Sequence, residues 1–222
     1  IQHKGCGYLI QKELKFLGQL LDSPAKPYVV VLGGSKVADK MKTIENLYKE
    51  ADAVLIGGAM GNTFRLAKDP NYKLPEGSKT PKPVEIENAK ILIEKAQKAE
   101  VKLLLPVDDV DSFDIGPKTV ELFKAEIRDA KTIFWNGPVG MFEKPQYANG
   151  TLNVARAIAD SSALKVVGGG DTVSALNMSG AASKMDHVST GGGASLEFLE
   201  GEGLPGISIL KTFAKRTEAQ AL

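Results

Sequence analysis

The sequence predicts an α/β fold, a doubly wound (Rossmann-like) six-stranded parallel sheet with helices on both faces. Three observations lead to this prediction. Short apolar segments alternate with amphipathic segments along the 222 residues, as in repeated βαβ units. The apolar segments show no polar alternation, which is typical of parallel strands that are buried on both faces. Almost every apolar segment ends in glycine, and this indicates flexible loops at the edge of the sheet where such folds bind ligands.

The expected strands are runs of Val, Ile, Leu and Phe, such as YVVVLGG from Tyr28 and AVLIGG from Ala53. Pro106 closes the third run, VKLLL. The six runs begin at residues 28, 53, 101, 131, 164 and 186. Residues 68–83 are rich in Pro, Lys and Gly, and we expect them to form a solvated loop.

The expected helices follow a period of 3.6 residues. In the first, Ile10, Leu14, Leu17 and Leu21 share one face, and Pro24 follows its end. The helices are expected over residues 8–21, 38–48, 84–100, 121–127, 152–159, 172–178 and after the triple glycine at 191–193.

The composition favours a globular protein without a nucleic-acid or membrane partner. The 28 Lys and Arg residues nearly cancel the 27 Asp and Glu residues, so no global field attracts a polyanion. No apolar run approaches the ~20 residues that span a bilayer, and the first residues lack the apolar region of a secretory signal. The single cysteine, Cys6, excludes an internal disulfide and fits a reducing compartment. We therefore expect a cytoplasmic protein.

The segment VVGGGDTVSALNMSG, residues 166–180, is the first candidate for a ligand site. Glycines before a helix allow close approach of a ligand, and the N–H groups of the first helical turn attract anions. Asp171 opens this helix, where its carboxylate is suited to capping the backbone, to binding Mg²⁺, or to both. Without a ligand, the same segment is a tight turn. Five glycine corners are expected on one edge, at residues 33–34, 57–58, 137, 168–170 and 191–193. Their convergence favours a bound ligand.

Two lysines at one of these corners suit a polyphosphate. Lys36 follows Gly33 and Gly34, and Lys40 lies one helical turn later on the same face. The alternative is a solvated helix face with two unrelated lysines. Glu143 is a candidate for hydrogen bonds to ribose hydroxyls, or is a surface glutamate.

Other catalytic patterns are missing. The sequence has no Walker P-loop and no G-x-S-x-G elbow, and its one G-x-G-x-x-G, at residues 201–206, follows a helix. His3 and His187 are too far apart to suggest a metal pair, and the acidic run 108–114 is expected to be a solvated loop. The lack of an acid–base or nucleophilic residue fits phosphoryl transfer, in which the protein mainly positions phosphates and stabilises charge.

Several stretches resemble phosphoglycerate kinases, in the family's order and spacing. They are VLGGSKVADK, FDIGPKT, FWNGPVGMFE, VVGGGDTVSA and HVSTGGGASLEFLEG, with GYLIQKEL near the start. The resemblance runs from about Gly5 to Gly206 and covers the C-terminal, nucleotide-binding half of this two-lobed family. It implies a nucleotide-binding domain over residues 1–206 and a C-terminal tail over 207–222, with the N-terminal substrate lobe absent.

The resemblance implies an activity. The family transfers a phosphoryl group between 1,3-bisphosphoglycerate and ADP, giving 3-phosphoglycerate and ATP, with Mg²⁺. It also implies a monomer in which Asp171 binds the metal and Lys36 stabilises the moving phosphoryl group. The residues implied in catalysis are Lys36, Gly170 and Gly193. The residues implied in nucleotide binding are Gly33, Gly34, Lys36, Lys40, Gly57, Gly58, Phe113, Asn136, Pro138, Glu143, Gly169, Gly170, Asp171, Thr172, Gly191 and Gly192.

The chain also departs from the family pattern. The segment between LPVDDV and FDIGPKT is usually longer, with a glycine and a leucine where Ser112 and Phe113 stand. Phe113 therefore alters the expected adenine pocket, and the preferred base stays open. Either the loop is short or the sequence omits a stretch.

Two functions fit these observations, and a third does not. The chain is the nucleotide lobe of a phosphoglycerate kinase that is catalytic with its partner lobe, or it is an isolated module that binds ADP or ATP without appreciable turnover. Both predict nucleotide affinity, and they differ in turnover. An unrelated dinucleotide or nucleotide-sugar enzyme is disfavoured by the missing dinucleotide fingerprint.

Overall fold

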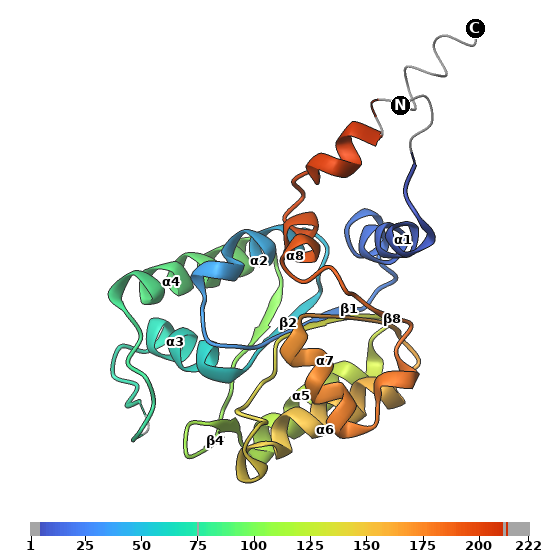
Figure 1. The fold of residues 1–222 in the computed structure, drawn as a ribbon. Helices are drawn as coiled ribbons and strands as arrows, with labels where there is room; N and C mark the ends of the chain where they lie inside the picture. Colours follow the sequence, from blue (N-terminus) through green and yellow to red (C-terminus); the bar gives the residue numbers. More distant parts are fainter. Residues whose placement is uncertain (1–4, 75, 211, 213–222) are drawn as a thin grey trace, which may run out of the picture.

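Six strands form one parallel sheet in the order β3–β2–β1–β6–β7–β8, with helices on both faces (Figure 1). The predicted fold class is confirmed. The structure is a computed structural model that describes residues 5–74, 76–210 and 212. The strands of this sheet are β1 (Tyr28–Leu32), β2 (Ala53–Ile56), β3 (Lys102–Leu104), β6 (Thr132–Asn136), β7 (Leu164–Gly168) and β8 (His187–Val188).

The strand order reverses between β1 and β6, which lie side by side although about one hundred residues separate them in sequence. Their register runs from Tyr28↔Thr132 to Leu32↔Asn136. Every residue of both strands is buried, which explains why the apolar runs show no polar alternation. The reversal opens a crevice at the carboxyl ends of β1 and β6, the place where sheets of this type bind ligands.

The helices divide between the two faces of the sheet. Those on one face are α5 (Pro117–Asp129), α6 (Asn149–Asp160) and α7 (Gly170–Ser179). Those on the other are α1 (Tyr8–Asp22), α2 (Met41–Leu47), α3 (Gly58–Lys68), α4 (Pro83–Lys98) and α8 (Gly193–Leu199). The short 3-10 helices among the described residues are η1 (Ala38–Lys40), η2 (Pro145–Tyr147) and η3 (Ala182–Lys184). None of the described helices is both long and apolar enough to cross a bilayer.

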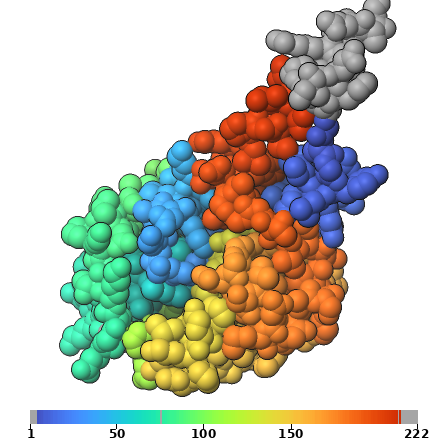
Figure 2. Space-filling view, in the orientation of Figure 1, coloured from blue at the N-terminus to red at the C-terminus, as the bar shows by residue number. Residues whose placement is uncertain are grey.

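The two ends of the described chain meet on one side of the molecule. Figure 2 shows α1, in blue, directly beside the orange and red segment that contains α8. Glu13 on α1 accepts hydrogen bonds from the backbone N–H of Thr190, at 2.7 Å, and from its hydroxyl. The other Glu13 oxygen lies 2.9 Å from Nε2 of the buried His187, whose ring stacks on Phe16. Glu13 therefore fastens α1 to the loop that follows β8.

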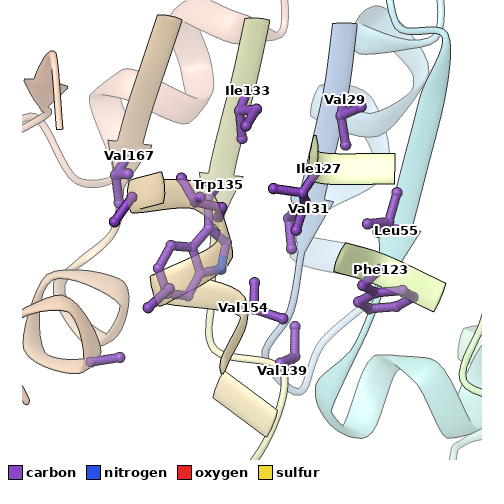
Figure 3. Packing of buried hydrophobic residues seen from close by; sticks show 14 of the residues in the cluster. Val29, Val31, Leu55, Phe123, Ile127, Ile133, Trp135, Val139, Val154 and Val167 are labelled. Carbon is purple, nitrogen blue, oxygen red and sulfur yellow. The ribbon is translucent and has the colours of Figure 1, made fainter. Parts of the chain in front are cut away.

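Each face of the sheet has its own core. On the α5–α6–α7 side, Val31 and Trp135 pack with Phe123 of α5 and Val154 of α6 (Figure 3). Trp135 is fully buried. On the opposite side the buried residues from the helices include Leu20, Ile44, Phe64, Leu92 and Leu199. Successive residues of a strand point to opposite faces, so Val30 and Val31 belong to different cores.

Two features differ from the sequence-based expectations. Helix α3 was not predicted, because its residues follow a diglycine and include Asn62, Thr63 and Arg65 within an apolar pattern. The acidic run contains a hairpin of β4 (Asp109–Val110) and β5 (Asp114–Ile115). The expected domain end at residue 206 stays a prediction: residues 205–210 are helical, and most of the expected tail lies outside the described residues.

The acidic run is not simply a solvated loop, so that prediction was wrong in part. Asp108 accepts hydrogen bonds from the backbone N–H groups of Lys118 and Thr119 and caps α5. Asp109 forms an ion pair with Arg65 at 3.0 Å, and Asp114 is buried. Carboxylates with these partners order the chain between β3 and α5.

Candidate functional site

The loops that follow β1, β6 and β7 surround a cavity of about 290 Å³ at the carboxyl edge of the sheet. This space, termed the edge cavity, lies beside the reversal of strand order between β1 and β6. Its walls are Gly34, Ser35, Lys36, Asp39, Lys40, Asn136, Gly137, Pro138, Gly169, Gly170, Asp171 and Thr172. The structure thus brings together the two lysines and the aspartate that the sequence singled out, on one cavity.

A larger hollow of about 700 Å³ lies between α5 and α6, but its position argues against a functional site. Ser161 and Ser162, which line it, lie in the short turn before β7. The hollow is therefore at the amino ends of the strands, opposite to the edge where parallel sheets bind ligands. The edge cavity is smaller, and it has the favourable location.

Lys40 occupies the inner wall of the edge cavity. Its Nζ donates hydrogen bonds to the backbone oxygens of Gly33, at 2.8 Å, and Asn136, at 3.1 Å. Burial lowers the pKa of Lys40 to about 8, against the opposing effect of the Asp171 and Asp39 carboxylates. The ammonium is thus held in place before any ligand arrives, and an added negative charge would favour its protonated form.

Lys36 lies nearer the opening of the edge cavity. Its side chain is 67% exposed, and Nζ is 3.6 Å from the Asp39 carboxylate, an exposed ion pair of little energetic weight. Such a pair is easily exchanged for a stronger partner. Lys36 and Lys40 therefore differ: Lys40 is fixed, and Lys36 is free to follow a ligand.

The first turn of α7 faces the edge cavity from the β7 side. Gly169 has φ 93° and follows the end of β7, and α7 begins at Gly170. Helix geometry leaves the N–H groups of Gly170, Asp171 and Thr172 without an intrahelical acceptor, and the described residues provide none elsewhere. These N–H groups and the positive end of the helix dipole favour an anion here.

Asp171 is suited to a metal ion that also binds phosphate. Its side chain is exposed on the edge cavity, and the described residues place no hydrogen bond or ion pair on its carboxylate. No group of three or more His, Cys, Asp or Glu side chains with metal-binding geometry occurs in the described part of the chain. Mg²⁺ usually takes one or two protein carboxylates and completes its shell with phosphate oxygens and water. A single carboxylate beside a phosphate site fits this ion.

Four of the glycines expected to meet a ligand also pack closely against neighbouring loops, and their proposed contact with a ligand stays a prediction. The N–H groups of Gly33 and Gly34 donate to Asn136 and Pro138 oxygens, both at 3.0 Å. Gly58 N–H donates to the oxygen of Val139 at 2.8 Å. A Cβ on Gly33 would lie 2.0 Å from the Pro138 oxygen, and one on Gly57 would lie 2.5 Å from Val139. We term these segments, residues 33–34, 57–58 and 137–139, the interlocked loops. Their glycines allow the close contact, because a side chain at those positions would overlap the neighbouring loop.

Thr172 connects the interlocked loops to α7. Its hydroxyl accepts a hydrogen bond from the N–H of Gly137 at 2.7 Å, and the Thr172 side chain is fully buried. The backbone oxygen of Gly137 in turn accepts a hydrogen bond from Trp135 Nε1 at 2.8 Å. The wall of the edge cavity that contains Asn136 and Gly137 is therefore fixed from both sides.

Several expected site residues lie outside the lining of the edge cavity. Glu143 is exposed in the loop after β6. Phe113 and Gly58 line a second, smaller hollow next to it. Gly191, Gly192 and Gly193 follow β8, one strand beyond β7. The roles expected for these residues stay predictions. Residues along one edge of the sheet can contact different parts of a long ligand, so a place outside the edge cavity does not contradict them.

Two lining residues and one buried carboxylate were not singled out from the sequence. Ser35 and Asp39 line the edge cavity, and their place between Gly34 and Lys40 was the available signal. Asp114 accepts hydrogen bonds from the N–H groups of Gly150, at 2.6 Å, and Ile115. Burial raises the pKa of Asp114 to about 6, against the lowering effect of these two bonds. Nothing in a run of aspartates distinguishes this one.

Comparison with known proteins gives one consistent result. The family described as "Phosphoglycerate kinase" matches residues 1–202. A phosphoglycerate kinase of Clostridium botulinum (strain Hall) is 46% identical over 233 residues, which cover 95% of this chain and 58% of the relative. One of Clostridium tetani is 47% identical over 228 residues, covering 92% of this chain and 56% of the relative. The chain thus spans less than two thirds of the length of these relatives.

Solved structures agree with the sequence matches. The phosphoglycerate kinase of Coxiella burnetii superposes with a TM-score of 0.88 at 37% identity, over 94% of this chain and 58% of that one. That of Pyrococcus horikoshii gives a TM-score of 0.73 at 34% identity, over 92% and 56%. Both similarities extend over more than nine tenths of this chain.

Proposed function

Because the chain belongs to the phosphoglycerate kinase family, we propose that it carries the MgADP/MgATP site of an enzyme that transfers a phosphoryl group between 1,3-bisphosphoglycerate and ADP. The products in this direction are 3-phosphoglycerate and ATP. One observation carries the proposal: Lys36, Lys40 and Asp171 line the same cavity, together with the open N-terminus of α7. This arrangement combines two cations, a metal-binding carboxylate and unpaired N–H donors, as a polyphosphate requires.

The residues of the edge cavity suit binding of the phosphate chain. The N–H groups at residues 170–172 would donate to phosphate oxygens, and the fixed Lys40 ammonium would neutralise charge from the opposite wall. Asp171 would hold Mg²⁺, which supplies further charge neutralisation on the phosphates when bound. Asn136 and Pro138 line the part of the edge cavity that is formed by the end of β6 and the loop after it.

Lys36 is the group we assign to the transferring phosphoryl group. Transfer forms a bond from an ADP oxygen to phosphorus and breaks the acyl phosphate bond, which leaves the carboxylate of 3-phosphoglycerate. Negative charge spreads over the equatorial oxygens during transfer, and a mobile ammonium at the cavity opening stabilises it there. The backbone N–H groups of Gly170 and Gly193 are proposed to act in the same way.

The acceptor site is proposed to lie in the part of the relatives that this chain does not match. The alternative function is therefore a nucleotide-binding module without appreciable turnover, because transfer needs both substrates in one water-poor cleft. The monomeric state and the cytoplasmic location also remain predictions. The module alternative and the enzyme differ only in turnover.

The test combines calorimetry with a turnover assay. The 222-residue chain is titrated with ADP in the presence and absence of Mg²⁺, and a coupled assay then measures turnover with 3-phosphoglycerate and ATP. We expect Asp171→Ala to weaken MgADP by roughly tenfold or more and metal-free ADP much less, since the lost carboxylate binds the metal. Asp39→Ala is the matched control, because Asp39 lines the same cavity and pairs with Lys36.

Each outcome has one interpretation. Binding of MgADP supports the proposed nucleotide site. Turnover would show that this chain also holds the acceptor site, and binding without turnover is the result expected of a chain that carries the nucleotide site alone. An equal change for MgADP and ADP in Asp171→Ala would remove the metal role of this residue. Failure of both nucleotides to bind would refute the proposed function.

A further inference from the structure

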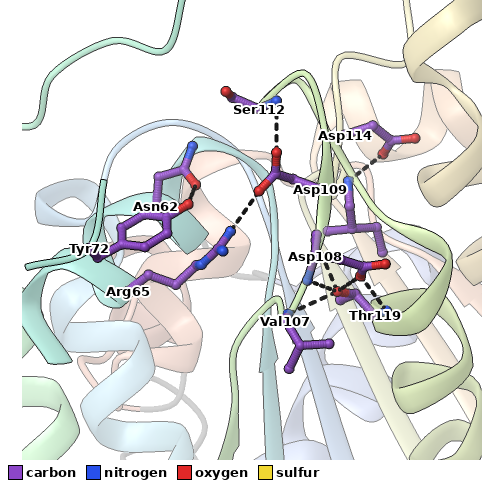
Figure 4. A network of polar contacts seen from close by, with 10 residues as sticks. Asn62, Arg65, Tyr72, Val107, Asp108, Asp109, Ser112, Asp114 and Thr119 are labelled. Atoms are coloured by element: carbon purple, nitrogen blue, oxygen red, sulfur yellow. Dashed lines mark hydrogen bonds and ion pairs between the residues drawn. The ribbon is translucent and has the colours of Figure 1, made fainter. Parts of the chain in front are cut away.

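The aspartates that follow β3 bind different partners (Figure 4). Asp108 caps α5, and Asp109 forms an ion pair with Arg65. Asp114 differs from both, because its carboxylate is buried and one of its partners, Gly150, lies far away in sequence. The buried carboxylate therefore connects the β4–β5 hairpin to another part of the fold.

Asp114 lies where the two ends of one loop come together. This loop, residues 137–148 between β6 and α6, is termed the β6–α6 loop. Asp114 Oδ2 accepts a hydrogen bond from the N–H of Gly150, in the first turn of α6, at 2.6 Å. A Cβ on Gly140 would lie 2.0 Å from Asp114 Oδ1, and a Cβ on Gly150 would lie 2.3 Å from the same oxygen. The carboxylate thus contacts the chain near the beginning of the loop and directly after its end.

The hairpin also contacts the middle of the β6–α6 loop. The N–H of Met141 donates to the backbone oxygen of Phe113 at 2.6 Å. The hydroxyl of Tyr147 bonds to the exposed Asp111 at 3.2 Å. Among these contacts Asp114 supplies a buried side chain, and its loss would leave the N–H of Gly150 without this acceptor. We therefore expect Asp114 to matter more for the order of the loop than the exposed contact does.

The β6–α6 loop extends from the edge cavity to the surface. Pro138 lines the cavity, and Glu143 is exposed in the same loop. Neither side chain suits a phosphate, because proline has no donor and the carboxylate has the same charge. Phosphates would instead meet Lys40 and the first turn of α7, which lie on other walls. The loop side of the site suits an uncharged nucleoside, whose sugar hydroxyls can donate to a carboxylate.

We propose that Asp114 is a positioning residue of the nucleotide site: it holds the β6–α6 loop so that Pro138 and Glu143 meet the nucleoside part of the ligand. This inference rests on the proposed function, because it needs a nucleotide in the edge cavity. Without the carboxylate the loop is ordered less well, and a nucleotide must order it on binding. The phosphate contacts should be unaffected, because the hydrogen bonds of Asp114 go to Gly150 and Ile115.

The experiment compares two ligands on the 222-residue chain by calorimetry with Mg²⁺: ADP, and inorganic tripolyphosphate, which has no nucleoside. We expect Asp114→Ala to weaken MgADP by roughly five- to tenfold and tripolyphosphate by less than about twofold. Asp114→Asn keeps one carbonyl oxygen as an acceptor for Gly150, so it should restore MgADP affinity to within about threefold of the unchanged chain. A change that acts on stability alone would leave both dissociation constants of the folded protein unchanged.

Asp108→Ala is the matched control. It removes a capping carboxylate from the same acidic run, but this carboxylate caps α5 and has no hydrogen bond to the β6–α6 loop among the described residues. The control should lose stability and keep both affinities within about twofold.

Hydrogen exchange measures the order of the loop without any ligand. In Asp114→Ala the protection of residues 137–150 should fall by roughly fivefold or more relative to that of α5, and Asp108→Ala should show the reverse. If Asp114→Ala fails to fold, Asp114→Asn is measured in its place, with an expected loss of about two- to threefold in MgADP affinity and faster exchange in the loop.

Three results would overturn the inference and leave the nucleotide site standing. The first is an equal loss for MgADP and tripolyphosphate in the Asp114 variant that folds. The second is an equal loss of MgADP affinity in Asp108→Ala, and the third is an Asp114 variant with unchanged affinity and unchanged exchange. If the unchanged chain binds neither ligand, the proposed function is refuted, and the positioning role is refuted with it.

Discussion

The carboxyl edge of the sheet contains two kinds of glycine, and they serve different purposes. In the interlocked loops, a Cβ on Gly33, Gly57 or Gly137 would lie 2.0 to 2.5 Å from neighbouring atoms. At the start of α7, by contrast, a Cβ on Gly170 would meet no described atom within 4 Å. The first kind lets one loop pack on another, and the second leaves space and N–H donors for a ligand. A diglycine in the sequence therefore does not by itself mark a binding site.

The largest expected effect comes from the first kind of glycine. Gly33→Ala should destabilise the fold by about 4 kcal/mol or more, because the new methyl group would overlap the backbone of Pro138. Gly170→Ala is the matched comparison and should change the free energy of unfolding by less than about 0.5 kcal/mol. Urea denaturation of both variants measures the contrast. Similar losses of unfolding free energy in Gly33→Ala and Gly170→Ala would contradict the division of these glycines into two kinds.

A smaller effect is expected where the two regions join. Thr172→Val should cost about 1–3 kcal/mol of stability, because the buried N–H of Gly137 loses its acceptor. Thr172→Ser keeps the hydroxyl and should lose much less. Thermal and urea unfolding of the pair would test this. A Ser variant as unstable as the Val variant would mean that the methyl group, rather than the hydrogen bond, stabilises the joint.

The buried Asp114 lies beside the interlocked loops, and its contribution to the stability of the fold depends on pH. Its pKa is raised from 3.8 to about 6, so the folded state holds the proton more tightly. The stability that protonation contributes is complete below pH 4 and is lost as pH rises through about 6. Asp114→Asn lacks this loss, so its stability relative to the unchanged chain should increase by about 1–2 kcal/mol between pH 4.5 and pH 7. Asp111→Asn serves as the control. If the stability of Asp114→Asn ran parallel to that of the unchanged chain between pH 4.5 and pH 7, the raised pKa of Asp114 would be contradicted.

The smallest effect concerns Lys40, which the interlocked loops hold against the edge cavity. With a pKa of about 8, part of the population is neutral at pH 8.5, and binding of a polyphosphate should take up a proton. MgADP affinity should fall roughly fourfold from pH 7 to pH 8.5. Calorimetry at pH 8.5 in buffers of different ionisation enthalpy measures the uptake, which should vanish in Lys40→Met. Uptake that persists in that variant would point to another group.

Much of the fold was predictable because it depends on burial, which the sequence expresses directly. The runs at residues 28–32 and 132–136 are apolar throughout since both faces of these strands are covered. Helix α3 escaped prediction because its buried Asn62 and Thr63 interrupt the apolar period, and their burial depends on contacts made only in the folded chain. The β4–β5 hairpin is too short to leave a periodic signal.

The candidate site was predictable in part for a different reason. Lys36, Lys40 and Asp171 follow strands that end at one edge, so the strand pattern alone brings them together. The interlocked loops were not predictable, because the contact between Gly33 and Pro138 joins segments about one hundred residues apart. The buried state of Asp114 likewise depends on Gly150, at the start of a helix remote in sequence.

Trp135, the single tryptophan of the chain, gives the molecule a built-in optical probe. Its indole is fully buried, bonds to Gly137, and directly precedes Asn136 on the wall of the edge cavity. Emission from this one side chain should therefore respond both to loss of the core and to occupancy of the neighbouring site. Unlabelled protein at low concentration is enough to follow both processes by fluorescence.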